Sequence, residues 1–203
     1  TVQAKLVLIG RSGLPPQDEW EELLSSQNKD DLLETKIKKV QHLEELGAEV
    51  LVLKADVADF QQMQNAINQV RNRFDNIHGV IHAACTSGAG IIQLKTPELA
   101  TQDFPPKLKG TLVLDAVLQD INLDFLVLFS SNTAITGGIG QVDYCAVNAF
   151  LDAFAHYNFY QQQNKTVSIN WDWWQGNNWA DSLMSAMPGL QTEFRKMREK
   201  YGI

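Results

Sequence analysis

The sequence predicts an α/β protein built on a Rossmann-like, doubly wound parallel sheet. Five short apolar runs, rich in β-branched residues, alternate with helical patterns along the chain, and this alternation is typical of right-handed βαβ units. The runs are nearly continuously apolar, as in strands that helices cover on both faces. With 203 residues, of which 44% are hydrophobic and 20% charged, the chain has the size of one globular domain. We therefore predict a single domain over residues 1–203.

The five runs give the predicted strands in chain order. They cover residues 4–9, 49–54, 79–82, 125–130 and 166–170. In an open parallel sheet, ligands bind across the carboxyl ends of the strands. The residues that directly follow each run are therefore the first candidates for binding and catalysis.

Two helices are predicted between the first three strands. The first covers residues 31–46 and ends at Gly47, where a left-handed C-terminal cap belongs. The second opens at Asp59, with Gln62 at the spacing of a capping box. Apolar residues at helical spacing then predict one buried stripe, which consists of Phe60, Met63, Ile67, Val70 and Phe74.

Two later helices are expected to carry the chemistry, over residues 105–118 and 143–160, the latter with Phe150, Phe154 and Tyr157 facing inward. Tyr144 and Asn148 lie one helical turn apart, so both side chains address the same face. Ser131 ends the fourth strand, and the glycine-rich loop that follows it allows the last helix to begin beside it.

A serine and a tyrosine in this arrangement fit the reduction of a ketone. A ketone that receives hydride develops negative charge on oxygen, so it needs a hydroxyl to orient it and an acid to donate a proton. Ser131 and Tyr144 meet these needs. A free phenol has a pKa of about 10, and Lys107 is the candidate cation to lower it. The alternative is that Tyr144 is an ordinary half-buried helix tyrosine and Ser131 a turn former.

The segments Lys107–Leu–Lys–Gly, Phe129–Ser–Ser131 and Tyr144–Cys–Ala–Val–Asn148 resemble the ketoreductase domains of modular polyketide synthases. These domains belong to the short-chain dehydrogenase/reductase superfamily. The resemblance implies that the catalytic residues are Lys107, Ser131, Tyr144 and Asn148. Free-standing members of the superfamily usually have lysine where this chain has Asn148, which favours a synthase domain.

Further segments resemble the same family over nearly the whole chain, and they imply an NADPH site. Arg11 would hold the ribose 2′-phosphate, because a guanidinium after the first visible strand selects NADPH over NADH. Arg11 alternatively is a surface loop residue, and Asp56 is compatible with both adenine binding and a turn or N-cap role. The cofactor-binding residues implied by the resemblance are Arg11, Ser12, Asp56, Val57, Ala83, Ala84, Lys107 and Tyr144.

The chain departs from the family pattern at two places. Cys85 stands where relatives usually have glycine after the two alanines. The first strand of the family and its glycine-rich phosphate loop, Thr-Gly-Gly-x-Gly-x-x-Gly, are expected to lie before residue 1. Residues 136–140 imitate that loop, but Asp143 occupies the position of its last glycine. We interpret this segment as a turn.

The resemblance implies that NADPH reduces a β-ketoacyl thioester presented by an acyl carrier protein. Ser131 and Tyr144 would hold the ketone oxygen, Tyr144 would donate the proton, Lys107 would lower its pKa, and Asn148 would order a relay. Neighbouring synthase domains are expected partners. Two other hypotheses stay open: a non-catalytic, reductase-like structural domain, and a free-standing short-chain reductase.

Composition argues against several other classes. The formal net charge of −7 gives no general field for nucleic acid or an anionic membrane. The longest apolar runs are strand-sized, far short of the roughly 20 residues that span a bilayer. Cys85 and Cys145 match neither a disulfide framework nor a zinc site, and the four histidines lack metal-ligand spacing. We expect a cytoplasmic protein without a metal.

The C-terminal part, residues 171–203, is the expected substrate lid. It holds four tryptophans, Trp171, Trp173, Trp174 and Trp179. Such aromatics could close over an acyl chain, or they could form a packing plug at the domain edge. The Leu-Asp-Asp signature of one subtype is missing over residues 86–93, so the configuration of the alcohol stays open.

Overall fold

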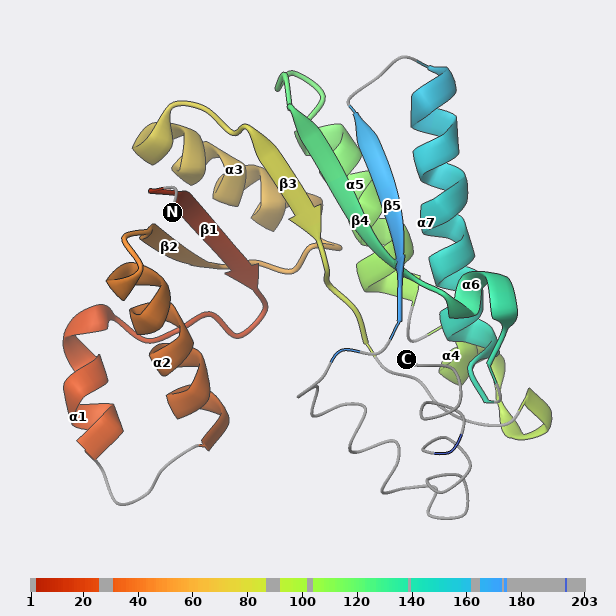
Figure 1. The fold of residues 1–203 in the computed structure, drawn as a ribbon, viewed down its shortest axis with the longest axis horizontal. Coiled ribbons are helices and arrows are strands. Elements are labelled where there is room, and N and C mark those ends of the chain that lie inside the picture. The colour runs from red at the N-terminus through yellow and green to blue at the C-terminus, as the bar shows by residue number, and fades with distance from the viewer. Residues whose placement is uncertain are drawn as a thin grey trace. The chain divides into compact units, whose positions relative to one another are not determined.

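The computed structural model describes residues 3–25, 31–86, 92–101, 104–138, 140–161, 165–172, 174 and 196 (Figure 1). The chain divides into two compact units. One consists of Thr1–Val80 and Pro105–Phe125, and the other of Ile81–Phe104 and Leu126–Ile203. The single domain predicted over residues 1–203 stays a prediction.

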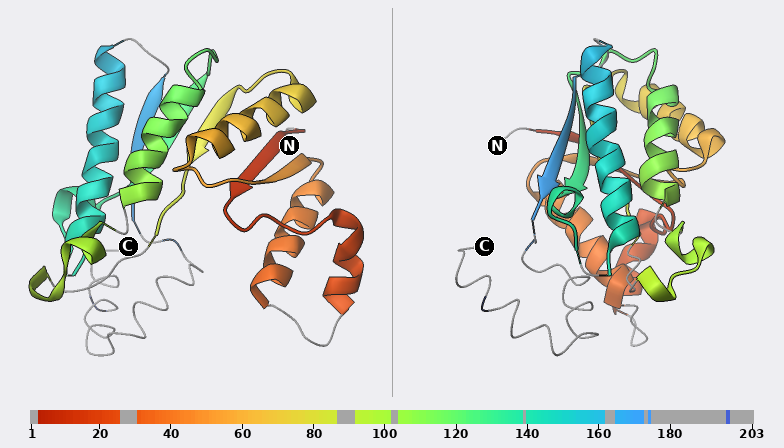
Figure 2. Two further views of the ribbon diagram at one scale, coloured as in Figure 1. Left: turned by 180° about the vertical axis from the view of Figure 1, so that it is seen from behind. Right: turned by 90° about the vertical axis from the view of Figure 1, so that its right-hand side faces the viewer.

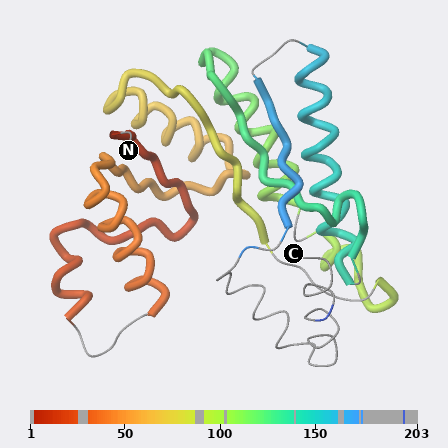
Figure 3. The backbone as a smooth tube through the Cα atoms, viewed as in Figure 1, coloured from red at the N-terminus to blue at the C-terminus, as the bar shows by residue number. Residues whose placement is uncertain are grey.

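The first unit contains a parallel strand pair, β1 (Lys5–Gly10) and β2 (Glu49–Lys54). The two strands run side by side in the backbone trace of Figure 3. A core cluster of Trp20, Ile37 and Val40 joins two helices of this unit, α1 (Trp20–Ser25) and α2 (Asp31–Glu45), to Val50 and Val52 of β2. The other helices are α3 (Phe60–Phe74) and α5 (Gly110–Val117), with a 3-10 turn at Gln17–Glu19.

The caps predicted for the first two long helices are confirmed. Gly47 follows α2 with a φ of 92°, a left-handed conformation that glycine adopts without strain. Asp59 caps α3, because its Oδ1 accepts from the Gln62 backbone N–H at 3.0 Å. Phe60 is 49% exposed, contrary to the prediction, because it is the first residue of the helix and lies at the end of the buried stripe.

The prediction that both faces of every strand are covered is wrong for β1, and it is also wrong at Ile81 and Val167 of two later strands, which are 60% and 50% exposed. Leu8 and Ile9 are 38% and 37% exposed. Among the described residues, β1 pairs with β2 alone, and the core cluster packs against the side chains of β2. Within the described part of the chain, one edge of β1 therefore has no paired strand, and some of its apolar side chains are partly exposed.

The helix predicted over residues 105–118 is present over residues 105–117, but its first turn departs from α-helical geometry. A π-helical turn, Pro105–Lys109, precedes α5. The Thr111 hydroxyl donates to the Lys107 carbonyl. A side-chain bond of this kind competes with the regular backbone ladder and distorts the helix, and it therefore accounts for the irregular turn.

The second unit holds a sheet in the order β3–β4–β5, formed by Gly79–His82, Phe125–Ser131 and Thr166–Trp171. Strand β3 starts in the first unit and ends in the second. Strands β4 and β5 are parallel. All five observed strands agree with the predicted ranges to within one residue. The prediction of an α/β fold with parallel strands is confirmed.

The long helix α7 (Val142–Tyr160) packs along β5, as both views in Figure 2 show. Its buried side chains include Val147, Leu151 and Phe154. Tyr157 is 56% exposed, so its predicted inward orientation is wrong, because it lies at the edge of this stripe. The unit also contains α4 (Pro97–Ala100), α6 (Thr133–Thr136) and a 3-10 turn at Ile92–Leu94. No helix within the described ranges combines the length and apolar character needed to cross a membrane.

Candidate active site

Ser131 lies at the carboxyl end of β4 and is 7% exposed. Its Oγ accepts hydrogen bonds from the Thr133 backbone N–H at 3.3 Å and from the Thr133 hydroxyl at 3.0 Å. Its own O–H points to the Asn132 Oδ1 at the long distance of 3.5 Å. Ser131 therefore forms the turn proposed as its alternative role, and the same contacts hold its Oγ in place with a weakly engaged proton.

Tyr144 lies in the first turn of α7 and is half-buried. Its backbone N–H donates to the Asp143 Oδ1 at 3.1 Å. Its carbonyl accepts from the Asn148 Nδ2 at 2.8 Å. Side-chain hydrogen bonds thus fix both the amide and the carbonyl of Tyr144.

Asn148 is fully buried and lies one turn after Tyr144. Its Nδ2 is used by the Tyr144 carbonyl, whereas its Oδ1 has no hydrogen-bond partner among the described residues. An unsatisfied buried acceptor costs about 1–3 kcal/mol. The position therefore suits an additional donor such as a hydroxyl, a water molecule or an ammonium group.

A polar network behind these residues joins β4, β5 and α7. The Ser130 hydroxyl donates to the Asn148 carbonyl at 3.2 Å. From β5, the Asn170 Nδ2 contacts the Ser130 Oγ at 3.3 Å and the Ser131 carbonyl at 3.1 Å. The same nitrogen donates to the Asp152 Oδ2 on α7 at 2.8 Å. The backbones of Ser131 and Asn148 are therefore joined through one set of hydrogen bonds.

The sequence interpretation missed the role of this network. One signal was available: Tyr144, Asn148 and Asp152 recur at every fourth residue, so they form a polar line on one face of a mainly apolar helix. Ser130 lies in a segment that carries the family resemblance, but nothing in its local sequence or in that of Asn170 indicates that the two residues contact each other.

In the first unit, the loops after β1 and β2 begin side by side, because the Ala55 N–H donates to the Gly10 carbonyl at 3.1 Å. These loops carry four of the predicted cofactor residues, Arg11, Ser12, Asp56 and Val57. Asp56 has the predicted turn role, since its Oδ1 accepts from the Ala58 N–H at 2.9 Å.

A basic residue that the sequence interpretation missed also lies at these loops. The Lys36 Nζ on α2 donates to the Ser12 hydroxyl at 3.1 Å. Arg11 is exposed beside Ser12 in sequence. The loop after β1 therefore carries Arg11 and Ser12, and Lys36 contacts it from α2, a donor set that suits a phosphate. A lysine at this helical position gives no signal in the sequence, because exposed helix lysines are common.

The remaining predicted site residues are Lys107, Ala83 and Ala84. Lys107 lies in the π-helical turn of the first unit and is 4% exposed. Ala83 and Ala84 follow β3 in the second unit and are exposed. The structure brings Ser131, Tyr144 and Asn148 into one network, and the position of Lys107 beside Tyr144 stays a prediction.

The tryptophans at the end of β5 and beyond it were predicted as a lid or a packing plug. The rings of Trp171 and Trp174 lie 4.8 Å apart, and Trp171 lies 5.3 Å from Phe129 of β4. This contact with a strand favours packing for these two side chains. Trp173, Trp179 and nearly all of the predicted lid lie outside the described residues.

Two smaller predictions concern the glycine-rich loop and metals. The loop is a turn, as predicted: the Gln141 N–H donates to the Gly138 carbonyl at 3.1 Å, and Gly140 has a φ of 71°. In the part of the chain that the structure describes, no group of three or more His, Cys, Asp or Glu side chains is placed to hold a metal ion. The expectation of a metal-free protein stays a prediction.

Known proteins resemble this chain in both sequence and fold. The KR domain family matches residues 2–176. Polyketide synthase PksL of Bacillus subtilis is 37% identical over 176 residues, which are 84% of this chain and 4% of that protein. The 6-methylsalicylic acid synthase of Aspergillus terreus is 33% identical over 181 residues, which are 88% of this chain and 10% of that protein.

Among solved structures, a ketoreductase domain from the bacillaene assembly line matches with a TM-score of 0.72 and 31% identity. The match covers 86% of this chain and 39% of that one. An N-terminal ketoreductase from the macrolactin assembly line matches with a TM-score of 0.70 and 32% identity, over 84% of this chain and 32% of that one. This chain belongs to the KR family: it is a ketoreductase domain of the polyketide synthase type, with the Rossmann-like fold of the short-chain dehydrogenase/reductase superfamily.

Proposed function

We propose that this domain uses NADPH to reduce a β-ketoacyl thioester, carried on an acyl carrier protein, to the β-hydroxyacyl thioester. The observation that carries the proposal is the fully buried Asn148, which donates to the Tyr144 carbonyl and keeps an unpartnered Oδ1. Ser130 links the same residue to the strand that ends at Ser131. The backbones of Ser131 and Tyr144 and a buried acceptor without a partner among the described residues are thus joined in one network.

The donor set of the first unit fits the phosphate of NADPH. Arg11, Ser12 and Lys36 would hold the ribose 2′-phosphate, since Lys36 already donates to the Ser12 hydroxyl. Asp56 and Val57 would border the adenine, and the backbone of Ala83 and Ala84 would pass beside the dinucleotide. The nicotinamide, when bound, supplies the hydride for the keto carbon.

The residues of the second unit supply the proton and hold the developing charge. Ser131 would donate its weakly engaged proton as a hydrogen bond to the ketone oxygen, and the Tyr144 phenol would transfer its proton to that oxygen. Lys107 would stabilise the phenolate that results and contact the nicotinamide ribose. The free Oδ1 of Asn148 would accept from the hydroxyl or water that returns a proton to Tyr144.

Several relatives are named polyketide synthases, of which this chain spans only a few per cent in length, such as 4% of PksL. Neighbouring synthase domains, an acyl carrier protein and a cytoplasmic location are therefore part of the proposal. A reductase-like structural domain is the main rival, because it would share the fold without turnover. Asn148, in place of the lysine usual in free-standing reductases, argues against a lone metabolic enzyme.

NADPH oxidation by the full-length protein, with a β-ketoacyl thioester mimic, tests the proposal. Tyr144→Phe is expected to lower turnover about 10²- to 10⁴-fold while NADPH binding, followed by fluorescence, is retained. Tyr157→Phe is the matched control, because Tyr157 is exposed on the same helix. If wild-type protein binds NADPH but reduces no thioester, the structural-domain reading is correct. Full activity of Tyr144→Phe would overturn the role of the phenol.

A further inference from the structure

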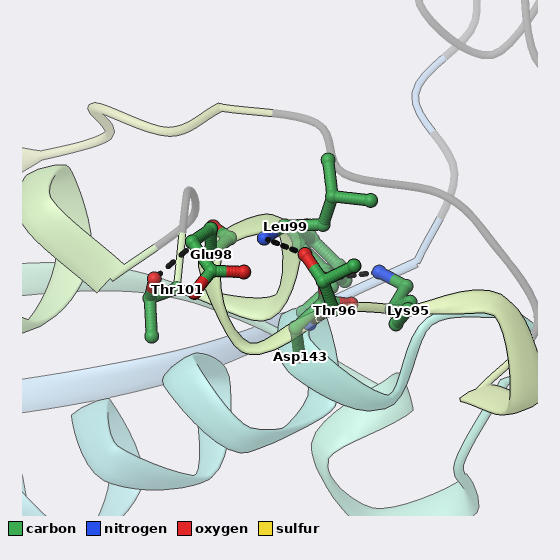
Figure 4. Close-up of polar contacts among 7 residues, drawn as sticks. Lys95, Thr96, Glu98, Leu99, Thr101 and Asp143 are labelled. Carbon is green, nitrogen blue, oxygen red and sulfur yellow. Dashed lines mark hydrogen bonds and ion pairs between the residues drawn. The ribbon is translucent and has the colours of Figure 1, made fainter.

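A buried ion pair lies one residue before Tyr144. The Lys95 Nζ contacts the Asp143 Oδ2, and the two side chains are only 7% and 1% exposed. Figure 4 shows Lys95 reaching Asp143 from the segment that leads into α4. The sequence interpretation assigned no role to Lys95, and it treated Asp143 only as a replacement for glycine.

The Asp143 carboxylate makes a second contact that concerns Tyr144 directly. Its Oδ1 accepts the Tyr144 backbone N–H at 3.1 Å. The N–H groups in the first turn of a helix have no partner within the helix, and the first regular bond here is from the Cys145 N–H to the Gln141 carbonyl. Asp143 therefore supplies a side-chain acceptor to the Tyr144 N–H, which precedes the first regular bond of the helix. A carboxylate in this turn is further stabilised by the helix dipole.

Lys95 is itself held by local structure on both sides. Its N–H donates to the Ile92 carbonyl at 3.3 Å within the preceding 3-10 turn. Thr96 caps α4, since its Oγ1 accepts from the Leu99 N–H at 3.3 Å. The Lys95 ammonium group thus projects from a short segment held by local hydrogen bonds. The Asp143 carboxylate contacts this ammonium group with one oxygen and the Tyr144 N–H with the other, so it links the position of Lys95 to that of Tyr144.

A pair of this kind has little value for stability alone. Burying two charges costs several kcal/mol per ion, and apolar replacements are often equally stable. We infer that Lys95 and Asp143 form a positioning pair, which fixes the first turn of α7 so that the Tyr144 phenol is aligned with the substrate ketone. This inference rests on the proposed reductase function. It adds the alignment of the Tyr144 phenol to the roles proposed for Lys107, Ser131, Tyr144 and Asn148.

Kinetics of the full-length protein provide the first test. Lys95→Met is expected to lower kcat about 10- to 100-fold with KM nearly unchanged, because small misplacements of a reacting group have effects of this size. Asp143→Asn, which is isosteric and retains an acceptor for the Tyr144 N–H, is expected to lower kcat less. The double variant Lys95→Met/Asp143→Asn leaves no unpaired buried charge at either position. Its stability should therefore recover relative to Lys95→Met, while its kcat stays low. Lys165→Met replaces an exposed lysine of the same unit and should leave kcat unchanged.

Hydrogen exchange at the Tyr144 amide tests the pair without requiring turnover. We expect this amide to exchange faster in Lys95→Met than in wild-type protein, and unchanged in Lys165→Met. Wild-type kcat in the double variant, or unchanged amide exchange in Lys95→Met, would overturn the inference. Absence of turnover in the wild type would instead reject the proposed function, and the exchange rates would still decide whether Lys95 positions Tyr144.

Discussion

The Ser130 hydroxyl donates a hydrogen bond to the Asn148 carbonyl at 3.2 Å, and this contact joins β4 to α7. Ser130 directly precedes Ser131, and Asn148 donates to the Tyr144 carbonyl. The bond therefore connects the backbone of the candidate orienting serine with the backbone of the candidate proton donor. Its removal should affect both stability and turnover.

Ser130→Ala is expected to lower the free energy of unfolding by about 1–3 kcal/mol. The substitution removes the donor to Asn148 and an acceptor of Asn170 in a site that is only 4% exposed. Urea denaturation monitored by circular dichroism measures the change. Ser25→Ala is the control, because the Ser25 hydroxyl makes an exposed bond to the Glu22 carbonyl and should contribute less than about 0.5 kcal/mol. Equal effects of the two substitutions would contradict the role of the network.

Gly110 lies close to Val57, and this contact predicts that Gly110→Ala changes stability in opposite directions depending on whether position 57 is valine or alanine. A Cβ at Gly110 would lie 2.8 Å from the Val57 Cγ1, and the β-branched valine has few rotamers with which to yield. Gly110→Ala is therefore expected to destabilise wild-type protein by about 1–3 kcal/mol. In a Val57→Ala background the clash is absent, and alanine should stabilise the helix by up to about 1 kcal/mol. Thermal unfolding of the four proteins tests this reversal, and destabilisation in both backgrounds would exclude Val57 as the cause.

Local patterns predicted most of the fold. The apolar runs located the five strands, and Asp59 and Gly47 marked the ends of helices, because strand burial and capping depend on residues near in sequence. The π-helical turn was missed, since it involves a bond from the Thr111 side chain to the Lys107 carbonyl. Helical spacing suggested that Tyr157 faces inward, but it did not define how far the buried stripe extends.

The candidate site was predicted less completely. Ketone chemistry and the resemblance both indicated Ser131 and Tyr144, whereas the resemblance alone indicated the role of Asn148. Lys95 and Asp143 are 48 positions apart, and Asn170 and Asp152 are 18 apart. Their pairings depend on how separate elements pack, which local propensity does not encode. The polar residues linked to Tyr144 and Asn148 are therefore identified only from the tertiary structure.

The Asp59 cap of α3 predicts a loss of stability in acid. The pKa of Asp59 lies below its ordinary value of 3.8, first because the Gln62 backbone N–H donates to the carboxylate. A carboxyl group with a lowered pKa in the folded state stabilises the protein above about pH 3.8, and this contribution is lost as the pH falls through the folded pKa. Asp59→Asn retains a capping oxygen but does not titrate. Its midpoint of thermal unfolding should fall below that of wild type at neutral pH and converge with it in acid, and a constant difference would refute the linkage.

Asp115 on α5 predicts the opposite sign. Burial raises the pKa of Asp115 above its ordinary value of 3.8, so its ionised form destabilises the folded protein at neutral pH. Asp115→Asn should raise the midpoint of thermal unfolding slightly at neutral pH. The gain should vanish below about pH 3.8, where the carboxyl group is protonated in both states. A gain that persists unchanged in acid would point to a cause other than charge burial.

The contact between Lys36 and Ser12 predicts which nicotinamide cofactor is preferred. The Lys36 Nζ donates to the Ser12 hydroxyl at 3.1 Å, so it is placed to neutralise a phosphate bound at the loop after β1. Lys36→Met should lower the ratio of kcat/KM for NADPH to that for NADH about 10-fold, as expected for one charge-assisted contact. Lys38→Met on the same helix is the matched control, because Lys38 is 63% exposed and pairs with Glu34 at 2.6 Å. A ratio that falls equally in both variants would indicate a general effect of charge, and an unchanged ratio in Lys36→Met would exclude the lysine from the phosphate site.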